Sequence, residues 1–230
     1  MAAAWVTSAS LAPAPTDDVV ASPVDRLVVA SSAGRMPDTS DRAARSSTAS
    51  IGSWARIASK PGIAATTSPP AAEIAFVSDG LTVASIYVPN GGKDFQAKMR
   101  FLEAMDAHAA ALQAAGRTAV LCGDLNVALT DLDLHPKERK PRAIGQLPEE
   151  RALLDRIISR GLVDVGRALA PDDEGLFTWW APWRNMRQRN IGWRIDYVLA
   201  SQALAARATA CPVQREVGTS DHAPVMAVFG

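Results

Sequence analysis

The stretch "TAVLCGDLN" at residues 118–126 has the pattern of a buried strand that ends in polar residues. An apolar run leads to Gly123, and Asp124 and Asn126 then stand two residues apart. Because successive side chains of a strand alternate between faces, these two project to the same side. The pattern predicts a carboxylate and an amide aimed at one point. An ordinary turn is the alternative interpretation, since Asp and Asn side chains readily bond the nearby backbone.

Strands and helices alternate around this stretch. Residues 74–92 predict two strands joined at Asp79-Gly80, a strong hairpin signal. Amphipathic helices are expected at 94–116 and 148–161, and strands at 194–200 and near 208–217. The order lacks a regular parallel βαβ rhythm, so the fold class is α/β or α+β, built as a layered sandwich.

The composition changes near residue 73. Of the first 72 residues, 43 are Ala, Ser, Pro or Thr, and none is Asn, Gln or Glu. Only 25–30 and 52–58 could form short strands. One interpretation of residues 1–72 is a disordered low-complexity tail, because few large apolar groups offset its ordering entropy. The other is translation of GC-rich DNA out of frame. We therefore expect the folded domain at 73–230.

Whole-chain composition limits the functional classes. The chain of 230 residues is 48% hydrophobic, which is enough for a sizeable core. With 24 basic and 24 acidic residues, bulk charge does not favour general coating of nucleic acid, although a local basic groove stays open. Two cysteines favour a reducing compartment. No signal-peptide or membrane-span pattern occurs, so we expect a cytoplasmic protein without membrane contact.

Three further motifs place polar residues at or near predicted strand ends. They are "IYVPNGGK" with Tyr87, Asn90 and Lys93, "WRIDYVL" with Asp196, and "TSDHAPV" with Asp221 and His222. Each has an ordinary structural explanation. Tyr87 suits a core position, Asp196 could pair with Arg194 on the same strand face, and His222 could be a satisfied loop histidine.

Together, "SIYVPNG", "GDLN", "GWRIDYVL" and "SDHAPV" resemble the endonuclease/exonuclease/phosphatase superfamily over about residues 73–230. Within it they are similar to the exodeoxyribonuclease III type of apurinic/apyrimidinic (AP) endonuclease. The resemblance implies a four-layered αββα sandwich with the active site at one end. It also implies a monomer that hydrolyses duplex DNA at abasic sites or 3′ ends with Mg²⁺ or Mn²⁺.

The resemblance also implies roles for single residues. His222 would be the general base and Asp196 its partner, while Asp124 would orient the attacking water or protonate the leaving 3′ oxygen. Asn126 would bind a phosphate oxygen, and Tyr87 and Asn90 would hydrogen-bond the phosphate or its neighbours. The implied metal ligands are Asp124, Asn126, Asp221 and His222.

A Trp-rich segment at 178–194 carries four arginines and no acid, and it holds four of the six tryptophans of the chain. Arginine neutralises phosphates, and flat rings can fill the space of a missing base. By resemblance, the segment forms a lesion pocket. The implied substrate contacts are Asn90, Lys93, Trp179, Trp180, Asn185, Arg187 and Trp193. The alternative is a Trp-rich core turn with solvated arginines. The basic residues at 137–142 suit a solvated loop better, because acids surround them.

The family pattern also includes an Asn on a first strand and a metal-binding Glu after a second. Both should precede residue 73, where this chain has neither residue type. Three functions therefore stay open: an active DNA-repair nuclease, an inactive or truncated relative, and a phosphodiesterase that acts on a small phosphate ester.

Overall fold

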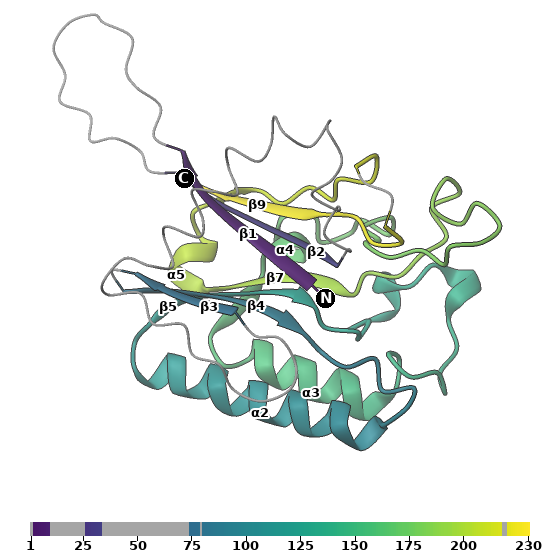
Figure 1. Cartoon of the computed structure of the whole chain (residues 1–230), viewed down its shortest axis with the longest axis horizontal. Coiled ribbons are helices and arrows are strands. Elements are labelled where there is room, and N and C mark those ends of the chain that lie inside the picture. Colours follow the sequence, from purple (N-terminus) through teal and green to yellow (C-terminus); the bar gives the residue numbers. More distant parts are fainter. Residues whose placement is uncertain (1, 10–25, 34–73, 79, 218–219) are drawn as a thin grey trace, which may run out of the picture.

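The computed structural model describes residues 2–9, 26–33, 74–78, 80–217 and 220–230 as two stacked sheets with helices against one of them (Figure 1). The four-stranded sheet has the order β1 (Ala2–Ala9), β2 (Arg26–Ala33), β9 (Val225–Phe229) and β8 (Ala208–Ala210). The five-stranded sheet has the order β3 (Ile74–Ser78), β4 (Leu81–Tyr87), β5 (Thr118–Asp124), β7 (Asp196–Ser201) and β6 (Leu162–Asp164). The helices are α2 (Phe95–Ala114), α3 (Pro148–Ile158), α4 (Val165–Leu169) and α5 (Gln202–Ala205), with short 3-10 turns η2 (Asp131–Asp133) and η3 (Pro136–Glu138).

The predicted hairpin and the two long helices are confirmed. Strands β3 and β4 pair antiparallel, and Gly80 has the positive φ of 88° that such a turn favours. Helix α2 starts after Asp94, whose carboxylate accepts the N–H of Ala97 at 2.8 Å, and it carries the chain to β5, which runs parallel to β4. This crossover places the ends of β4 and β5 at the same edge of the sheet.

Alternating side chains divide the core between the two faces of the five-stranded sheet. On one face, Leu121 and Leu199 pack with residues of α2 and α3 such as Leu102. On the other, Cys122 and Val198 pack with residues that include those of β9. The residues that the structure describes thus supply three of the four expected layers. In this part of the chain no helix covers the outer face of the four-stranded sheet (Figure 1).

Residues 2–9 and 26–33 form strands within the segment for which a low-complexity tail was one interpretation. The short strand expected at 25–30 is present as part of β2, whereas β1 was not expected. Both are short runs of mostly apolar and small residues. Strand β2 pairs on both sides, with β1 and β9, whereas β1 is an edge strand that pairs with β2 alone. The strand considered at 52–58 lies outside the described residues.

The strand expected near 208–217 is much shorter than predicted. It ends at Ala210, and only an isolated bridge between Val213 and Val225 follows. Pro212 has no N–H to give to a ladder, which accounts for the early end. The rest of this segment forms the loop that leads to "SDHAPV". Among the helices described, none has the length and apolar character needed to cross a bilayer.

Candidate active site

Three neighbouring strands place a row of polar side chains at one end of the five-stranded sheet. Tyr87 pairs with Asp124 across β4 and β5, and Asp124 pairs with Asp196 across β5 and β7. Paired residues lie on one face, and this face also carries Cys122 and Val198, which point toward the second sheet. The polar row therefore opens into the space between the sheets.

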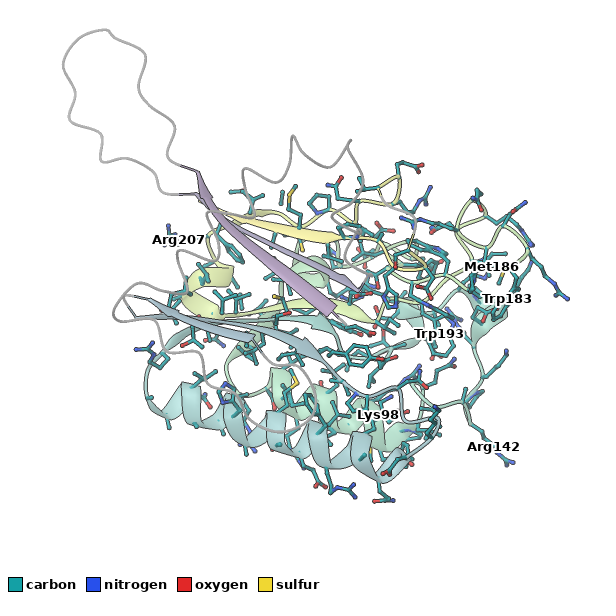
Figure 2. The ribbon with its side chains drawn as sticks, viewed as in Figure 1. Lys98, Arg142, Trp183, Met186, Trp193 and Arg207 are labelled. Carbon is teal, nitrogen blue, oxygen red and sulfur yellow. The ribbon has the colours of Figure 1, made fainter. Side chains whose placement is uncertain are left out.

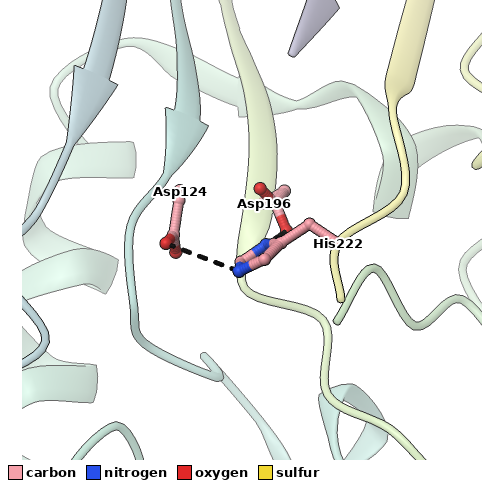
Figure 3. Close-up of side chains that lie close together, drawn as sticks. All are labelled: Asp124, Asp196 and His222. Atoms are coloured by element: carbon pink, nitrogen blue, oxygen red, sulfur yellow. Dashed lines mark hydrogen bonds and ion pairs between the residues drawn. The ribbon is translucent and has the colours of Figure 1, made fainter. Parts of the chain in front are cut away.

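His222 enters that space from the opposite side, on the loop just before β9. Its Nδ1 lies 2.9 Å from Asp196 Oδ2, and its Nε2 lies 4.0 Å from Asp124 Oδ2 (Figure 3). Its side chain is 11% exposed. The imidazole is thus held between two buried carboxylates that come from adjacent strands. Arg194 does not pair with Asp196, so that ordinary structural explanation is wrong.

The pKa values of this cluster are coupled through burial and charge. Burial lowers the pKa of His222, but the hydrogen bond and charge of Asp196 outweigh it, so the net shift is upward. The pKa of Asp124 is raised to about 7, first by burial and then by repulsion from Asp196. Burial, followed by the charge of Asp124, also raises the pKa of Tyr87. The site therefore concentrates negative charge that a proton or a cation relieves.

The donor atoms of this cluster fit a divalent cation. Within the described residues, the one group of three or more acidic, His or Cys side chains with ligand atoms inside 4.8 Å is Asp124, Asp196 and His222. Asp196 Oδ1 is buried and has no hydrogen-bond partner in the described part of the chain. Carboxylate oxygens are the donors that Mg²⁺ and Mn²⁺ prefer. Strands β1 and β2 contain no carboxylate that could add to this set.

Asp221 does not join this cluster. It is exposed, and its Oδ2 accepts a hydrogen bond from Trp179 Nε1 at 2.9 Å. Its metal-binding role was implied only by the resemblance, and the geometry gives it a local role in fixing the indole. Its backbone carbonyl also accepts the N–H of Trp180.

Asn126 lies just beyond β5 with a positive φ of 52°, so its side chain turns back toward Asp124. Its backbone N–H donates to Asp124 Oδ1 at 2.9 Å, and its Nδ2 donates to Asp124 Oδ2 at 3.0 Å. Asn90 is exposed and donates to Asn126 Oδ1 at 3.3 Å, while the exposed Lys93 lies nearby in the chain. In "GDLN" the two residues therefore form a turn and also point to one site, because the amide of Asn126 holds the carboxylate of Asp124 in place.

Trp179 and Trp193 border the histidine. Their rings meet edge to face with centroids 5.8 Å apart, and the ring of Trp179 lies 6.5 Å from that of His222. Both are partly exposed (Figure 2 labels Trp193). Trp180 is different, because it is 1% exposed and packs in a small core cluster with Phe177. Trp180 is therefore shielded in this conformation, and its contact with substrate stays a prediction.

Arg187 makes contacts within the protein, and the expected phosphate contact stays a prediction. Its guanidinium donates to the backbone oxygens of Arg215, Val217 and Ser220 at 2.7–3.0 Å, and it lies 5.0 Å over the ring of Trp180. It thus fastens the Trp-rich segment to the loop before His222. Asn185 is exposed at a positive φ of 53° and stays a candidate substrate contact.

Sequence reasoning missed the residues that support the row from behind. Arg194 is 2% exposed and donates to Asp133 Oδ1 at 2.7 Å and to Asp164 Oδ1 at 3.0 Å. The Thr178 hydroxyl accepts the backbone N–H groups of Ile195 and Asp196. Charged residues and threonine are typical of surfaces and turns, so the sequence does not mark them as buried. Only the "WRID" motif indicated that Arg194 lies next to the site.

Comparison with known proteins agrees with this geometry. The model of the endonuclease/exonuclease/phosphatase family matches residues 17–222. An exodeoxyribonuclease of Bacillus subtilis is 35% identical over 151 residues, which are 64% of this chain and 59% of that protein. The chain spans less than two thirds of the length of the first curated relatives it matches.

Solved structures give the same assignment. The 3′ phosphatase NExo from Neisseria, bound to a product DNA hairpin, is 28% identical with a TM-score of 0.66, covering 74% of this chain and 71% of that one. An AP endonuclease from Archaeoglobus fulgidus is 30% identical with a TM-score of 0.60, covering 68% and 64%. The motifs, the layered sheets and these matches agree, and the chain belongs to the endonuclease/exonuclease/phosphatase family.

Proposed function

We propose that this chain is a metal-dependent phosphodiesterase of DNA repair, which cuts duplex DNA 5′ of abasic sites or removes nucleotides from 3′ ends. The observation that carries the proposal is the position of His222 between Asp196 and Asp124. A phosphodiester is attacked by water, and a histidine fixed by a buried carboxylate is suited to take the proton of that water.

The geometry supports Nε2 of His222 as the proton-accepting atom. When Nδ1 of His222 donates its hydrogen to Asp196, Nε2 carries the free lone pair and faces Asp124. With a cation bound beside it, Asp124 would be ionised, because a positive charge lowers the pKa of a neighbouring carboxyl, and it would then be suited to orient the attacking water. A bound Mg²⁺ or Mn²⁺, held by Asp124 and the free oxygen of Asp196, would supply charge that stabilises the phosphate in the transition state.

Two features favour DNA over a small phosphate ester. The Trp-rich segment beside the site carries exposed side chains, including Trp183 at 59% exposure and Arg184 (Figure 2 labels Trp183). The Neisseria structure with bound product DNA and the Archaeoglobus fulgidus AP endonuclease share this fold, at 28% and 30% identity. An exposed indole and arginines next to a phosphodiester site suit a nucleic-acid duplex.

The first prediction concerns metal dependence. With Mg²⁺ or Mn²⁺ the chain should cut a duplex that carries one abasic site, and EDTA should abolish the cut. Because β1 and β2 supply no carboxylate, Mg²⁺ should saturate the reaction only at higher concentration than for the Bacillus subtilis relative assayed in parallel. The measurement is cleavage rate against metal concentration, with a phosphodiester of p-nitrophenol as competitor substrate.

The same assay separates the open alternatives. Faster turnover of the small diester than of abasic DNA would indicate the small-ester function. A folded chain that cuts neither substrate at any concentration of either metal would indicate an inactive relative.

The second prediction concerns lesion preference. Replacing Trp179 or Trp193 with Ala should reduce the preference for abasic over intact duplex, because these rings border His222 and are accessible. Trp180→Phe is the matched control, since that ring is buried and should influence stability instead. Competition binding with the two duplexes measures the preference. If all three variants lost the preference for abasic duplex equally, the lesion pocket would lie elsewhere.

The third prediction concerns pH. His222 must be neutral to accept a proton, so activity should rise with pH through its raised pKa. Asp196→Asn removes the hydrogen bond and charge that raise this pKa, so the acid limb of kcat/KM should move to lower pH while the maximum rate falls. Asp221→Asn removes a charge that raises the pKa of His222 less than Asp196 does, so the acid limb of kcat/KM should move less in this variant. An acid limb that stays in place in Asp196→Asn would assign it to another group.

The monomeric state stays a prediction from the family resemblance, and the cytoplasmic location stays a prediction from the sequence. Sedimentation of the purified chain would test the first of them.

A further inference from the structure

A buried ion pair lies directly beneath the "GDLN" turn, outside the residues so far given a role in chemistry. Lys98 on α2 pairs with Glu150 on α3, and both side chains are completely buried. Figure 2 shows Lys98 close to the start of α2 at this end of the sheet. Buried charges of this kind contribute little to stability, because desolvation offsets their attraction. Their location therefore needs another explanation.

The ammonium of Lys98 is aimed at the turn that holds the catalytic carboxylate. Its Nζ donates to the backbone oxygen of Asn126 at 2.7 Å. Asn126 in turn holds both oxygens of Asp124 through its own N–H and amide. Since Asn126 has the less favourable left-handed backbone, the bond to its carbonyl fixes a conformation that the chain would otherwise leave easily.

Glu150 extends the same support to the other side of the site. Its Oε2 accepts the N–H of Gly145 at 2.6 Å and of Leu147 at 3.0 Å. A Cβ added at Gly145 would lie 3.0 Å from the ring of Trp193 and 3.1 Å from the oxygen of Asn126. The loop that Glu150 fastens is therefore the surface against which Trp193 rests.

The loop that carries Asn90 also touches this pair. A Cβ added at Gly91 would lie only 2.9 Å from Lys98 Cδ, so this glycine allows the lysine stem to pass under the loop. One ion pair thus contacts three loops of the site: that of Asn90, that of Asn126 and that of Gly145.

We propose that Lys98 and Glu150 are positioning residues, which hold Asp124 and Trp193 in their reactive geometry rather than stabilise the fold. This inference rests on the proposed nuclease function. It predicts that removal of the pair lowers kcat far more than it lowers stability or raises KM. A displacement of reacting groups by about 1 Å is enough to cost on the order of 10²-fold in rate.

The decisive variant is the double substitution Lys98→Met with Glu150→Leu, which replaces the pair by apolar side chains of similar length and leaves no unpaired charge. On abasic duplex, kcat should fall by about 10²-fold with a smaller change in KM. The melting temperature should fall as well, because the backbone groups of Asn126, Gly145 and Leu147 lose their partners, so the control must show what a loss of stability alone does to kcat. Asp106→Asn is the matched control. Asp106 joins α2 to Arg156 and Arg160 away from the site, so this change should lower stability and leave kcat unchanged.

Amide resonances give a readout that does not depend on activity. In the double variant the ¹⁵N–¹H signals of Asn126, Gly145 and Leu147 should shift, and in Asp106→Asn they should not. Should the double variant fail to fold, Lys98→Met with Glu150→Gln is measured in the same way, because the new amide oxygen still accepts from the loop and no buried charge is left unpaired. A folded variant with parental kcat and unshifted signals would overturn the positioning role. A parent chain that cuts no DNA, with shifts as expected, would instead refute the nuclease function alone.

Discussion

His222→Ala should reduce cleavage of abasic duplex by about 10²- to 10⁴-fold, the usual cost of losing a general base. His222 lies at the centre of the cluster, between Asp196 on one side and Asp124 on the other. Affinity for the duplex should change little, because the contacts to DNA come from other side chains. Single-turnover rates and duplex binding, measured on the same preparation, test both parts.

A histidine remote from the site provides the control for this result. His108 lies exposed on α2, and His108→Ala should keep the parental rate. Parental activity in His222→Ala would show that another group takes the proton, and the dyad with Asp196 would then be structural.

Arg194→Leu should produce the largest loss of stability, about 3–5 kcal/mol. The guanidinium is the shared partner of Asp133 and Asp164, which are 1% and 8% exposed, and its removal leaves two buried carboxylates with much less compensation. Arg167 still reaches Asp133, but from a partly exposed position. Unfolding by urea, followed by circular dichroism, measures the change.

Two further variants make this result specific. Arg100→Leu removes an arginine that is 66% exposed and 3.8 Å from Asp94, and it should cost at most about 1 kcal/mol. Adding Asp133→Asn and Asp164→Asn to Arg194→Leu should recover part of the loss, because the amides need no counter-charge. Equal stability of Arg194→Leu and the parent would mean that the two carboxylates are satisfied without it.

The positions of Tyr87, Asp124 and Asp196 could be predicted from the sequence because each stands at the end of an apolar run, or just before one. A strand end and its alternation are local properties, so one sequence is enough to indicate them. The register that aligns the three in one row is not local, and neither is the arrival of His222 from the second sheet. For these the family resemblance was needed.

The features that the sequence did not reveal have a common cause. Residues 178–194 have no helical or strand periodicity, so the sequence could not distinguish the accessible Trp179 from the buried Trp180. In the same way, Lys98 and Glu150 have the residue types of a solvated helix face, and only the packing of α2 on α3 buries them. Charged side chains are almost never buried unless paired, and the partner cannot be found from one sequence.

The dyad also has a consequence for how this protein becomes active. Asp196 belongs to the five-stranded sheet, whereas His222 is carried by the loop that leads into β9 of the four-stranded sheet. In the proposed mechanism, neither sheet supplies the oriented proton acceptor by itself. During refolding, the circular dichroism of strands and helices should therefore return before catalysis, which starts only when the two halves dock. The rate of cleavage would therefore measure how well the two sheets are aligned in the proposed nuclease.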